Sequence, residues 1–264
     1  MRKISGIILT RNNERTIKEA VNSIKDIVDE LLIIDDSSTD KTLEIIKSIY
    51  PEAKIFQRKL DRFDAQRNFG IEKANYDWIL MIDSDEIVTR ELGRSIVAAM
   101  ENPQYDAYIC YRLNKIFPNY SVRDFMVERP LLFKNLFQFT GALHESMKVE
   151  RFGILAGDLL HNVHFNLTSW LQKTPTIKLH AQKWLDQGRE YGLFTLAILV
   201  FFLPIYEFFK KFFIQKAFKN GFFEGFLYAL VHSWYWVFVI MYYYELRHKE
   251  KASSKEYIRK DLRQ

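Results

Sequence analysis

The stretch WILMIDSDE, residues 78–86, runs five apolar residues straight into three carboxylates within four positions. A short apolar run that ends in polar residues is typical of a buried strand. Asp83 and Asp85 lie two positions apart, so a regular strand would project both carboxylates to the same side. Like charges held that close repel each other unless a cation intervenes. The stretch therefore predicts a buried strand whose end holds something positive.

Strand and helix patterns alternate on both sides of this stretch, through about residue 116. Apolar runs predict the strands, and apolar residues at helical spacing predict the helices between them. The predicted strands are 4–10, 31–35, 53–57, 78–82 and 106–113, and the predicted helices are 17–28, 43–49, 65–74 and 90–100. Such alternation with short connections predicts an α/β fold, in which helices cover a mostly parallel sheet.

Three polar clusters follow three of the predicted strands. They are TRNNE at 10–14, DDSSTD at 35–40 and DSDE at 83–86. Because ligands bind beyond the carboxyl ends of strands in such sheets, we expect the clusters to converge on one site. In the second cluster Asp35 ends a strand, where a carboxylate can accept from a nucleobase or from ribose hydroxyls. An ordinary strand-to-helix turn has the same sequence, and that alternative stays open.

The pair Asp83 and Asp85 suits a hard divalent cation. Mg²⁺ and Mn²⁺ take oxygen ligands, and Mg²⁺ usually keeps water or substrate phosphates in its coordination shell. By itself the Asp-x-Asp spacing often arises by chance. Here it follows a predicted buried strand, and two other predicted strands also end in polar residues, which makes a metal site more specific as an interpretation. We therefore predict a bound Mg²⁺ or Mn²⁺ that faces a diphosphate.

The composition separates a main domain from a different carboxyl-terminal part. Aromatic residues make up 16% of the 264 residues and crowd after residue 190, so we expect one domain at 1–190 and a helical segment at 191–264. The basic residues behind the net charge of +5 cluster beside apolar runs, which disfavours a nucleic-acid partner. Cys110, the single cysteine, is expected to be a buried thiol in a reducing compartment. The amino-terminal apolar run is too short for a signal peptide, so we expect the main domain in the cytosol.

Two long apolar segments lie in the carboxyl-terminal part. Residues 193–206 are fourteen uncharged residues, and residues 226–244 are nineteen residues without Asp, Glu, Lys or Arg. Only the second is long enough to cross a bilayer comfortably, and basic residues on both of its sides argue against a single crossing. We predict a peripheral or monotopic pair of helices on the cytoplasmic leaflet of the cell membrane. The alternative is a buried helical cap or an oligomer contact.

Four segments in this order resemble the family 2 glycosyltransferases, which have the GT-A fold. They are ILTRNNE at 8–14, IIDDSSTDKT at 33–42, DAQRNFGIEKANYDWILMIDSDE at 64–86 and GALHES at 141–146. Within the family, the chain is most similar to the group of lipopolysaccharide-core glucosyltransferases. The resemblance covers residues 4 to about 190. It implies transfer of a sugar from a nucleotide-diphosphate donor such as a UDP-sugar to a glycan or lipid-linked acceptor, with inversion and with a divalent metal.

The resemblance also implies which residues contact the nucleotide. Thr10, Asn12 and Glu14 match the family's first loop, which lies near the nucleotide. Asp35 matches the acidic residue expected at the base or the ribose. Arg67 lies in the QRN segment of a helix that packs beneath the nucleotide site.

The remaining matches concern the metal, the diphosphate and the acceptor. Asp83 and Asp85 match the family's DxD motif, with Asp85 the more direct metal ligand. His161 matches a histidine that faces the diphosphate, and we expect it to contact the phosphate or the metal, whereas His164 is expected to be structural. Glu145 matches the candidate general base. An inverting transfer is a single in-line displacement, so it needs a base for the acceptor's proton and a counter-charge for the diphosphate. Arg129 is a further candidate for the diphosphate, although a surface ion pair is the commoner fate of an arginine.

Two other functional classes compete with this interpretation. A nucleotidyltransferase shares the nucleotide-binding half of the fold, but it usually has a glycine-rich loop after the first strand, and TRNNERT at 10–16 contains no glycine. A non-catalytic sugar- or lipid-binding module is disfavoured because Asp83, Asp85 and Glu145 are all retained.

Overall fold

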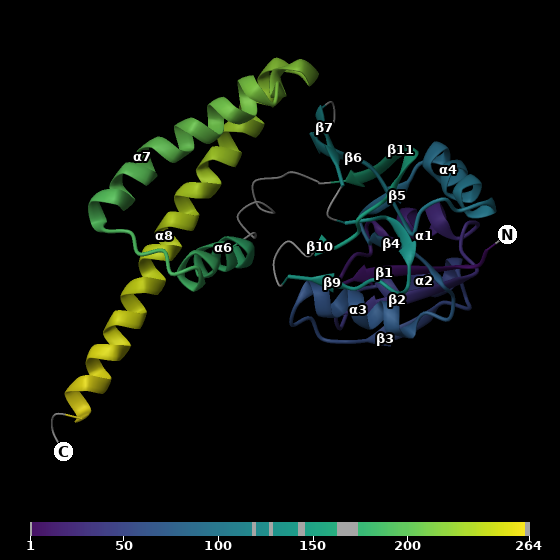
Figure 1. Ribbon diagram of the computed structural model, residues 1–264, viewed down its shortest axis with the longest axis horizontal. Helices are drawn as coiled ribbons and strands as arrows, with labels where there is room; N and C mark the ends of the chain where they lie inside the picture. Colours follow the sequence, from purple (N-terminus) through teal and green to yellow (C-terminus); the bar gives the residue numbers. More distant parts are fainter. Residues whose placement is uncertain (1, 118–119, 127–128, 142–145, 163–173, 262–264) are drawn as a thin grey trace. The chain divides into compact units, whose positions relative to one another are not determined.

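The computed structural model describes residues 2–117, 120–126, 129–141, 146–162 and 174–261 (Figure 1). Its internal contacts divide the chain into two compact units. The first unit comprises Met1–Lys115 and Val122–Val163, and the second comprises Ile116–Ser121 and His164–Gln264.

Four parallel strands form one half of the sheet in the first unit. Their order is β3 (Lys54–Gln57), β2 (Glu30–Asp35), β1 (Ile4–Thr10) and β4 (Trp78–Asp83). The helices that connect them are α1 (Ile17–Ile24), α2 (Thr42–Ile49) and α3 (Phe63–Lys73), and α4 (Arg90–Glu101) follows later in the chain, between β5 and β6. These strands and helices confirm the alternation predicted from apolar spacing.

The other half of the sheet is mixed in direction and was only partly predicted. Beyond β4 the order continues with β8 (Leu132–Lys134), β6 (Ala107–Phe117), β11 (Gly153–Asn162) and β5 (Glu86–Val88), while β7 (Tyr120–Phe125) pairs with β6. Strand β8 is antiparallel to both of its neighbours, and β11 runs parallel to β6. A separate two-stranded ladder joins β9 (Phe139–Thr140) to β10 (Ser146–Met147).

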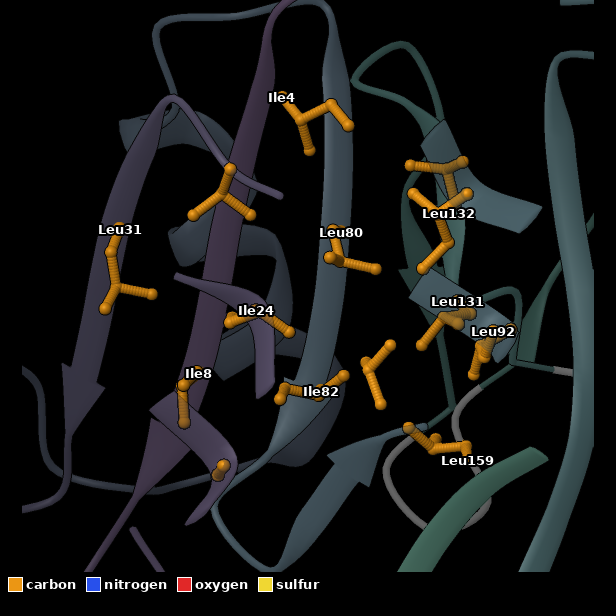
Figure 2. Close-up of a cluster of buried hydrophobic side chains, with 14 of the residues drawn as sticks. Ile4, Ile8, Ile24, Leu31, Leu80, Ile82, Leu92, Leu131, Leu132 and Leu159 are labelled. Carbon is orange, nitrogen blue, oxygen red and sulfur yellow. The ribbon is translucent and has the colours of Figure 1, made fainter. Parts of the chain in front are cut away.

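Apolar side chains cover both faces of this sheet. On one face Ile8, Leu80 and Ile82 pack with Ile24 of α1 and Leu92 of α4 (Figure 2). The neighbouring positions point to the opposite face, because side chains alternate along a strand. There the core residues include Ile7, Leu32 and Ile34, with Ile71 of α3 and Phe139 of β9. Burial on both faces explains why the strands read as nearly continuous apolar runs.

The second unit is helical in its described residues from Thr174 onward. It contains α6 (Thr174–Asp186), α7 (Leu193–Phe209), a π-helical turn at Lys210–Ile214, a 3₁₀ turn at Ala217–Asn220 and the long α8 (Phe222–Asp261). Helices α6 and α7 each pack against α8. Their shared core contains Ile177, Ala181, Leu196, Val239, Ile240 and Tyr243. Helix α6 precedes the predicted domain boundary at 190/191, and its contacts assign it to this second unit.

Candidate active site

The ends of β1, β2 and β4 meet at one edge of the sheet. Thr10 of β1 pairs with Asp35 of β2, and Leu9 of β1 pairs with Asp83 of β4. Asp35 and Asp83 therefore lie on either side of β1. The three polar clusters thus lie at one edge of the sheet, as predicted, and the binding site expected there stays a prediction.

The loops after β1 and β2 are hydrogen bonded to each other. The backbone N–H of Asn12 donates to Ser38 Oγ at 2.9 Å, and Asn12 Oδ1 accepts from the backbone N–H of Thr39 at 2.7 Å. Glu14 Oε2 accepts from the backbone N–H of Lys41 at 3.3 Å. Asn12 has a φ of 52°, a left-handed conformation in which asparagine is enriched. Asn12 and Glu14, both predicted to lie near the nucleotide, thus hold the two loops together.

Thr10 and Asp35 make their hydrogen bonds within the same edge. The Thr10 hydroxyl donates to Asn13 Oδ1 at 3.2 Å. Asp35 is fully buried and accepts from the backbone N–H of Ser38 at 3.0 Å and from Ser38 Oγ at 2.5 Å. These contacts are those of the strand-to-helix turn, the alternative left open for this segment. The predicted contact of Asp35 with a base or ribose stays a prediction.

Asp83 ends β4 between two arginines. Arg67 Nη2 donates to its Oδ1 at 3.0 Å, and Arg129 Nη1 donates to its Oδ2 at 2.5 Å. The arginine side chains are only 3% and 15% exposed. Burial alone would raise the pKa of Asp83, but the charges of Arg129 and Arg67 outweigh it and hold that pKa well below its ordinary value. The positive charge expected beside this carboxylate is supplied by the protein itself.

Glu86, a fully buried carboxylate in β5, belongs to the same network. Its Oε2 accepts from the backbone N–H of Asp83 at 2.9 Å, and its Oε1 accepts from Arg129 Nη2 at 2.5 Å and from Arg112 Nη1 at 3.5 Å. Burial would lower the pKa of Arg129, but the charges of Asp83 and Glu86 raise it instead. No role was predicted for Glu86 or Arg112. Arg129 was expected either at the diphosphate or in a surface ion pair, and its buried ion pairs with Asp83 and Glu86 were not predicted.

Asp85 has a different partner from Asp83. Strand β4 ends at Asp83, and Asp85 lies in the turn that follows, so the two carboxylates do not project from one regular strand as expected. Asp85 Oδ2 lies 3.3 Å from His161 Nε2, and its side chain is 38% exposed. His161 comes from β11, which pairs with β5 at Glu86. The structure therefore brings the predicted residues Asp85 and His161 together.

Asn114 determines which nitrogen of His161 carries the proton. Asn114 Nδ2 donates to Asp124 Oδ2 at 2.8 Å and to the carbonyl of Val122 at 3.3 Å, so its Oδ1 faces His161 Nδ1 at 2.7 Å. An amide oxygen only accepts, so Nδ1 must be the protonated nitrogen. A neutral His161 therefore presents the lone pair of Nε2 toward the carboxylate of Asp85. Carboxylate oxygen and imidazole nitrogen together are ligands of divalent transition metals.

Asp85 and His161 fit a cation only as part of a larger coordination shell. Within the part of the chain that the structure describes, no three His, Cys, Asp or Glu side chains are grouped closely enough to hold a metal. Divalent cations that act on phosphates commonly complete their shell with water and substrate oxygens. The two side chains fit that kind of site, and they do not form an all-protein cage.

Helix α3 connects the carboxylate network to the β9–β10 ladder. Arg67, which binds Asp83, is followed by Asn68, whose side chain donates to the carbonyl of Phe139 at 2.9 Å and accepts from its N–H at 2.8 Å. Asp64, one turn earlier, accepts from the backbone N–H of Gly141 at 3.1 Å. One helix thus fixes Asp83 through Arg67, β9 through Asn68, and the residue after β9 through Asp64.

Two predicted residues lie outside the described part of the chain. Glu145, the candidate base, falls in 142–145, between Gly141 and Ser146 of β10. His164, expected to be a structural residue, falls in 163–173. Both assignments stay predictions.

The family model described as Glycosyl transferase family 2 matches residues 5–155 of this chain. The match covers more than half of the 264 residues and includes the ends of β1, β2 and β4.

Curated relatives extend the similarity along the chain. An uncharacterized glycosyltransferase of Rickettsia typhi is 28% identical over 251 residues, which cover 88% of this chain and 84% of that protein. The SPbeta prophage-derived glycosyltransferase SunS of Bacillus subtilis is 36% identical over 85 residues, or 32% of this chain and 20% of that protein.

A solved structure shares the fold. Residues 1–349 of S. aureus TarS, in complex with UDP-GlcNAc, match with a TM-score of 0.50 at 16% identity, covering 95% of this chain and 92% of that chain. The likeness supports the GT-A fold that the sequence resemblance implied.

Proposed function

Since the chain belongs to glycosyl transferase family 2, we propose that it moves a sugar from a nucleoside-diphosphate donor, a UDP-sugar first of all, to a glycan or lipid-linked acceptor of the cell envelope. The transfer is proposed to invert the anomeric carbon. One observation carries the proposal: Asp85 Oδ2 and His161 Nε2 lie 3.3 Å apart, just beyond the sheet edge where Asp35 and Asp83 end their strands.

The proposed division of labour follows from the contacts at this edge. Asp85 and His161 hold a divalent cation, Mg²⁺ or Mn²⁺, together with the donor's diphosphate. When bound, such a cation supplies Lewis acidity at the departing phosphate oxygens. Asp83 is already neutralised by Arg67 and Arg129, so its part is to fix the turn that carries Asp85. This narrows the predicted metal ligands from Asp83, Asp85 and His161 to the last two.

Glu145 is proposed as the general base on the acceptor side. The support comes from its place in the LHE segment and from the described residues that flank it. Gly141 is held by Asp64, and Ser146 pairs with Thr140 in the β9–β10 ladder. A base positioned there takes the proton from the acceptor hydroxyl as that oxygen attacks the anomeric carbon.

The protein is proposed to act at the cytoplasmic face of the cell membrane, to which its second unit attaches it. Two helical stretches support this proposal: Leu193–Ile214, with 22 residues, and Phe222–His248, with 27 residues, are long and apolar enough to cross a membrane by length and composition. A lipid-linked acceptor would be presented at that surface.

Binding of a panel of nucleotide sugars, measured by thermal shift with and without Mn²⁺, tests the proposed donor class. We expect at least one UDP-sugar or related donor to raise the melting temperature by roughly 5 °C when Mn²⁺ is present, since a ligand at 100 times its Kd stabilises by about 2.7 kcal/mol. UDP alone should give a smaller Mn²⁺-dependent shift. Stabilisation by nucleoside triphosphates and by no nucleotide sugar would instead indicate a nucleotidyltransferase.

The substitution Glu145→Gln tests the base. We expect sugar transfer to fall by about 10²–10⁴-fold, because a positioned carboxylate contributes a factor of that size. Binding of UDP with Mn²⁺, measured by calorimetry, should stay unchanged. Transfer is measured as UDP release when the donor found in the panel is mixed with a bacterial membrane extract. Glu150→Gln, at an exposed carboxylate five positions away, is the matched control. If Glu145→Gln also abolishes UDP binding, Glu145 has a structural role and the assignment as base is wrong.

A further inference from the structure

The surface of α7 is apolar over most of its circumference. Between Leu193 and Tyr206 none of the exposed side chains is charged. Only two of them, Thr195 and Tyr206, carry a hydroxyl group. At 100° per residue these positions extend around roughly two thirds of the helix. The large exposed side chains of α7 are Leu193, Phe194, Ile198, Val200, Phe201, Phe202, Ile205, Tyr206 and Phe209.

Helix α8 adds a second apolar surface. Its large exposed side chains up to residue 244 are all apolar or aromatic and lie within one sector of the helix: Phe222, Phe223, Phe226, Leu230, Trp234, Met241 and Tyr244. A helix that lies flat at a membrane surface is amphipathic, with a polar face toward the water. Helix α7 has no such face between Leu193 and Tyr206. This argues against the pair of in-plane helices predicted from sequence and for a surrounding hydrocarbon.

The two helices are packed side by side in opposite directions. At one end the backbone N–H of Tyr191 donates to the hydroxyl of Tyr243 at 3.2 Å, and at the other end the rings of Phe208 and Phe226 lie 5.4 Å apart. The 17 residues of α7 extend about 25 Å at 1.5 Å per residue. The hydrocarbon core of a bilayer is about 30 Å thick, and a small shortfall is accommodated by local thinning or by flanking side chains.

Both ends of this helix pair carry groups that favour the membrane interface. Next to Tyr191 and Tyr243, the rings of Trp184 and Trp236 stack at 6.0 Å, and aromatic belts of this kind occur at the headgroup level. At the turn, Glu207 pairs with Lys210 at 3.3 Å. Lysine side chains near helix ends reach out to the interface while their stems stay in apolar surroundings.

We propose that the segment Leu193–Tyr244 crosses the bilayer twice as a helical hairpin, with the turn at 210–219 on the side opposite to both flanks. The distribution of basic residues gives the direction. The turn holds four lysines, whereas the flanks hold three basic residues in 174–192 and seven in 245–264. Cytoplasmic segments carry the excess of Lys and Arg, so the flanks are cytoplasmic. The partner of the exposed aromatic surface is lipid hydrocarbon, and the proposal does not depend on the sugar-transfer reaction.

Single introduced cysteines in the full chain test the hairpin. The native Cys110 is fully buried, and burial raises the pKa of its thiol to about 12, so it stays unreactive. Gln215→Cys labels the turn, and Gln187→Cys labels the flank before α7; both positions are exposed glutamines. Sealed inside-out vesicles from an expressing bacterium are treated with a membrane-impermeant maleimide, before and after detergent.

We expect Gln187→Cys to react at once in inside-out vesicles and Gln215→Cys to react only after detergent, with the order reversed in right-side-out vesicles. The protein should also stay in the membrane pellet after washing with alkaline carbonate. Labelling of both cysteines from the same side would overturn the proposal, whether the helices lie in one leaflet or outside it. Release by carbonate as a soluble dimer would overturn it too, because a second copy of the chain would then cover the apolar surface.

Discussion

The substitution Asp85→Asn is expected to lower sugar transfer by about 10³-fold, because Lewis-acid stabilisation of a leaving phosphate is worth several kcal/mol and each 1.36 kcal/mol is tenfold in rate. Asparagine keeps the size of the side chain but removes the negative charge. His161 would then be the single remaining side chain of the proposed pair that can bind the cation. The turn after β4 should still form, because its hydrogen bonds to Asp83 and Glu86 do not involve Asp85.

Activity as a function of Mn²⁺ concentration is the measurement for Asp85→Asn. We expect the half-saturating Mn²⁺ concentration to rise at least tenfold in addition to the loss of rate. Asp26→Asn, which removes an exposed carboxylate between α1 and β2, is the control and should behave as the wild type. A variant that keeps both the wild-type rate and the wild-type Mn²⁺ response would show that Asp85 holds no cation.

The substitution Arg129→Met is expected to lower the free energy of unfolding by about 3 kcal/mol, because removing one partner of a buried ion pair leaves the other charge uncompensated. Arg129 bridges Asp83 and Glu86 with bonds of 2.5 Å to each. Methionine fills a similar volume but donates nothing. Asp83 retains Arg67 as a charged partner. Glu86 retains the backbone N–H of Asp83, but its only remaining charged partner is Arg112 at 3.5 Å, so the charge of Glu86 is the less compensated of the two.

Urea unfolding of the full chain in detergent, followed by tryptophan fluorescence, measures this loss, with Trp78 of β4 reporting on the first unit. Arg123→Met is the matched control. Its partner Asp158 is 27% exposed and Arg123 itself is 51% exposed, so the expected cost is about 0–1 kcal/mol. Equal stabilities of the two variants would show that the network around Asp83 is solvated and contributes little.

The parallel half of the sheet was predictable because three of its four strands, β1, β2 and β4, are buried on both faces. Residues such as Ile7 and Ile8 must both be apolar when cores lie above and below, and the resulting continuous runs stand out in the sequence. The mixed half carries weaker signals. Strands β5 and β8 have three residues each, and β11 contains a register shift between Ile154 and Asp158. The alternation of apolar and polar residues is therefore too short or too irregular to predict these strands.

The candidate site was predictable where it follows strand ends and less so where it depends on pairing across the sheet. Asp35, Asp83 and Asp85 could be singled out from the sequence because polar residues interrupt apolar runs there. The partners of Asp83 and Glu86 come from α3, β6 and the segment before β8, and nothing local in the sequence links those segments. The tautomer of His161 depends likewise on Asn114, 47 positions away. The available signal was a carboxylate, Glu86, inside the buried strand β5.

Helix α3 sets a limit on how the chain can change in length. Arg67 and Asn68 are consecutive, yet one holds β4 at Asp83 and the other holds β9 at Phe139. A single residue inserted between them would rotate Asn68 by about 100° and carry it 1.5 Å along the axis, so that both attachments could not be kept at once. Surface loops elsewhere accept insertions at small cost. In α3, the number of residues between the side chains that bind β4 and β9 is therefore as constrained as the identity of those side chains.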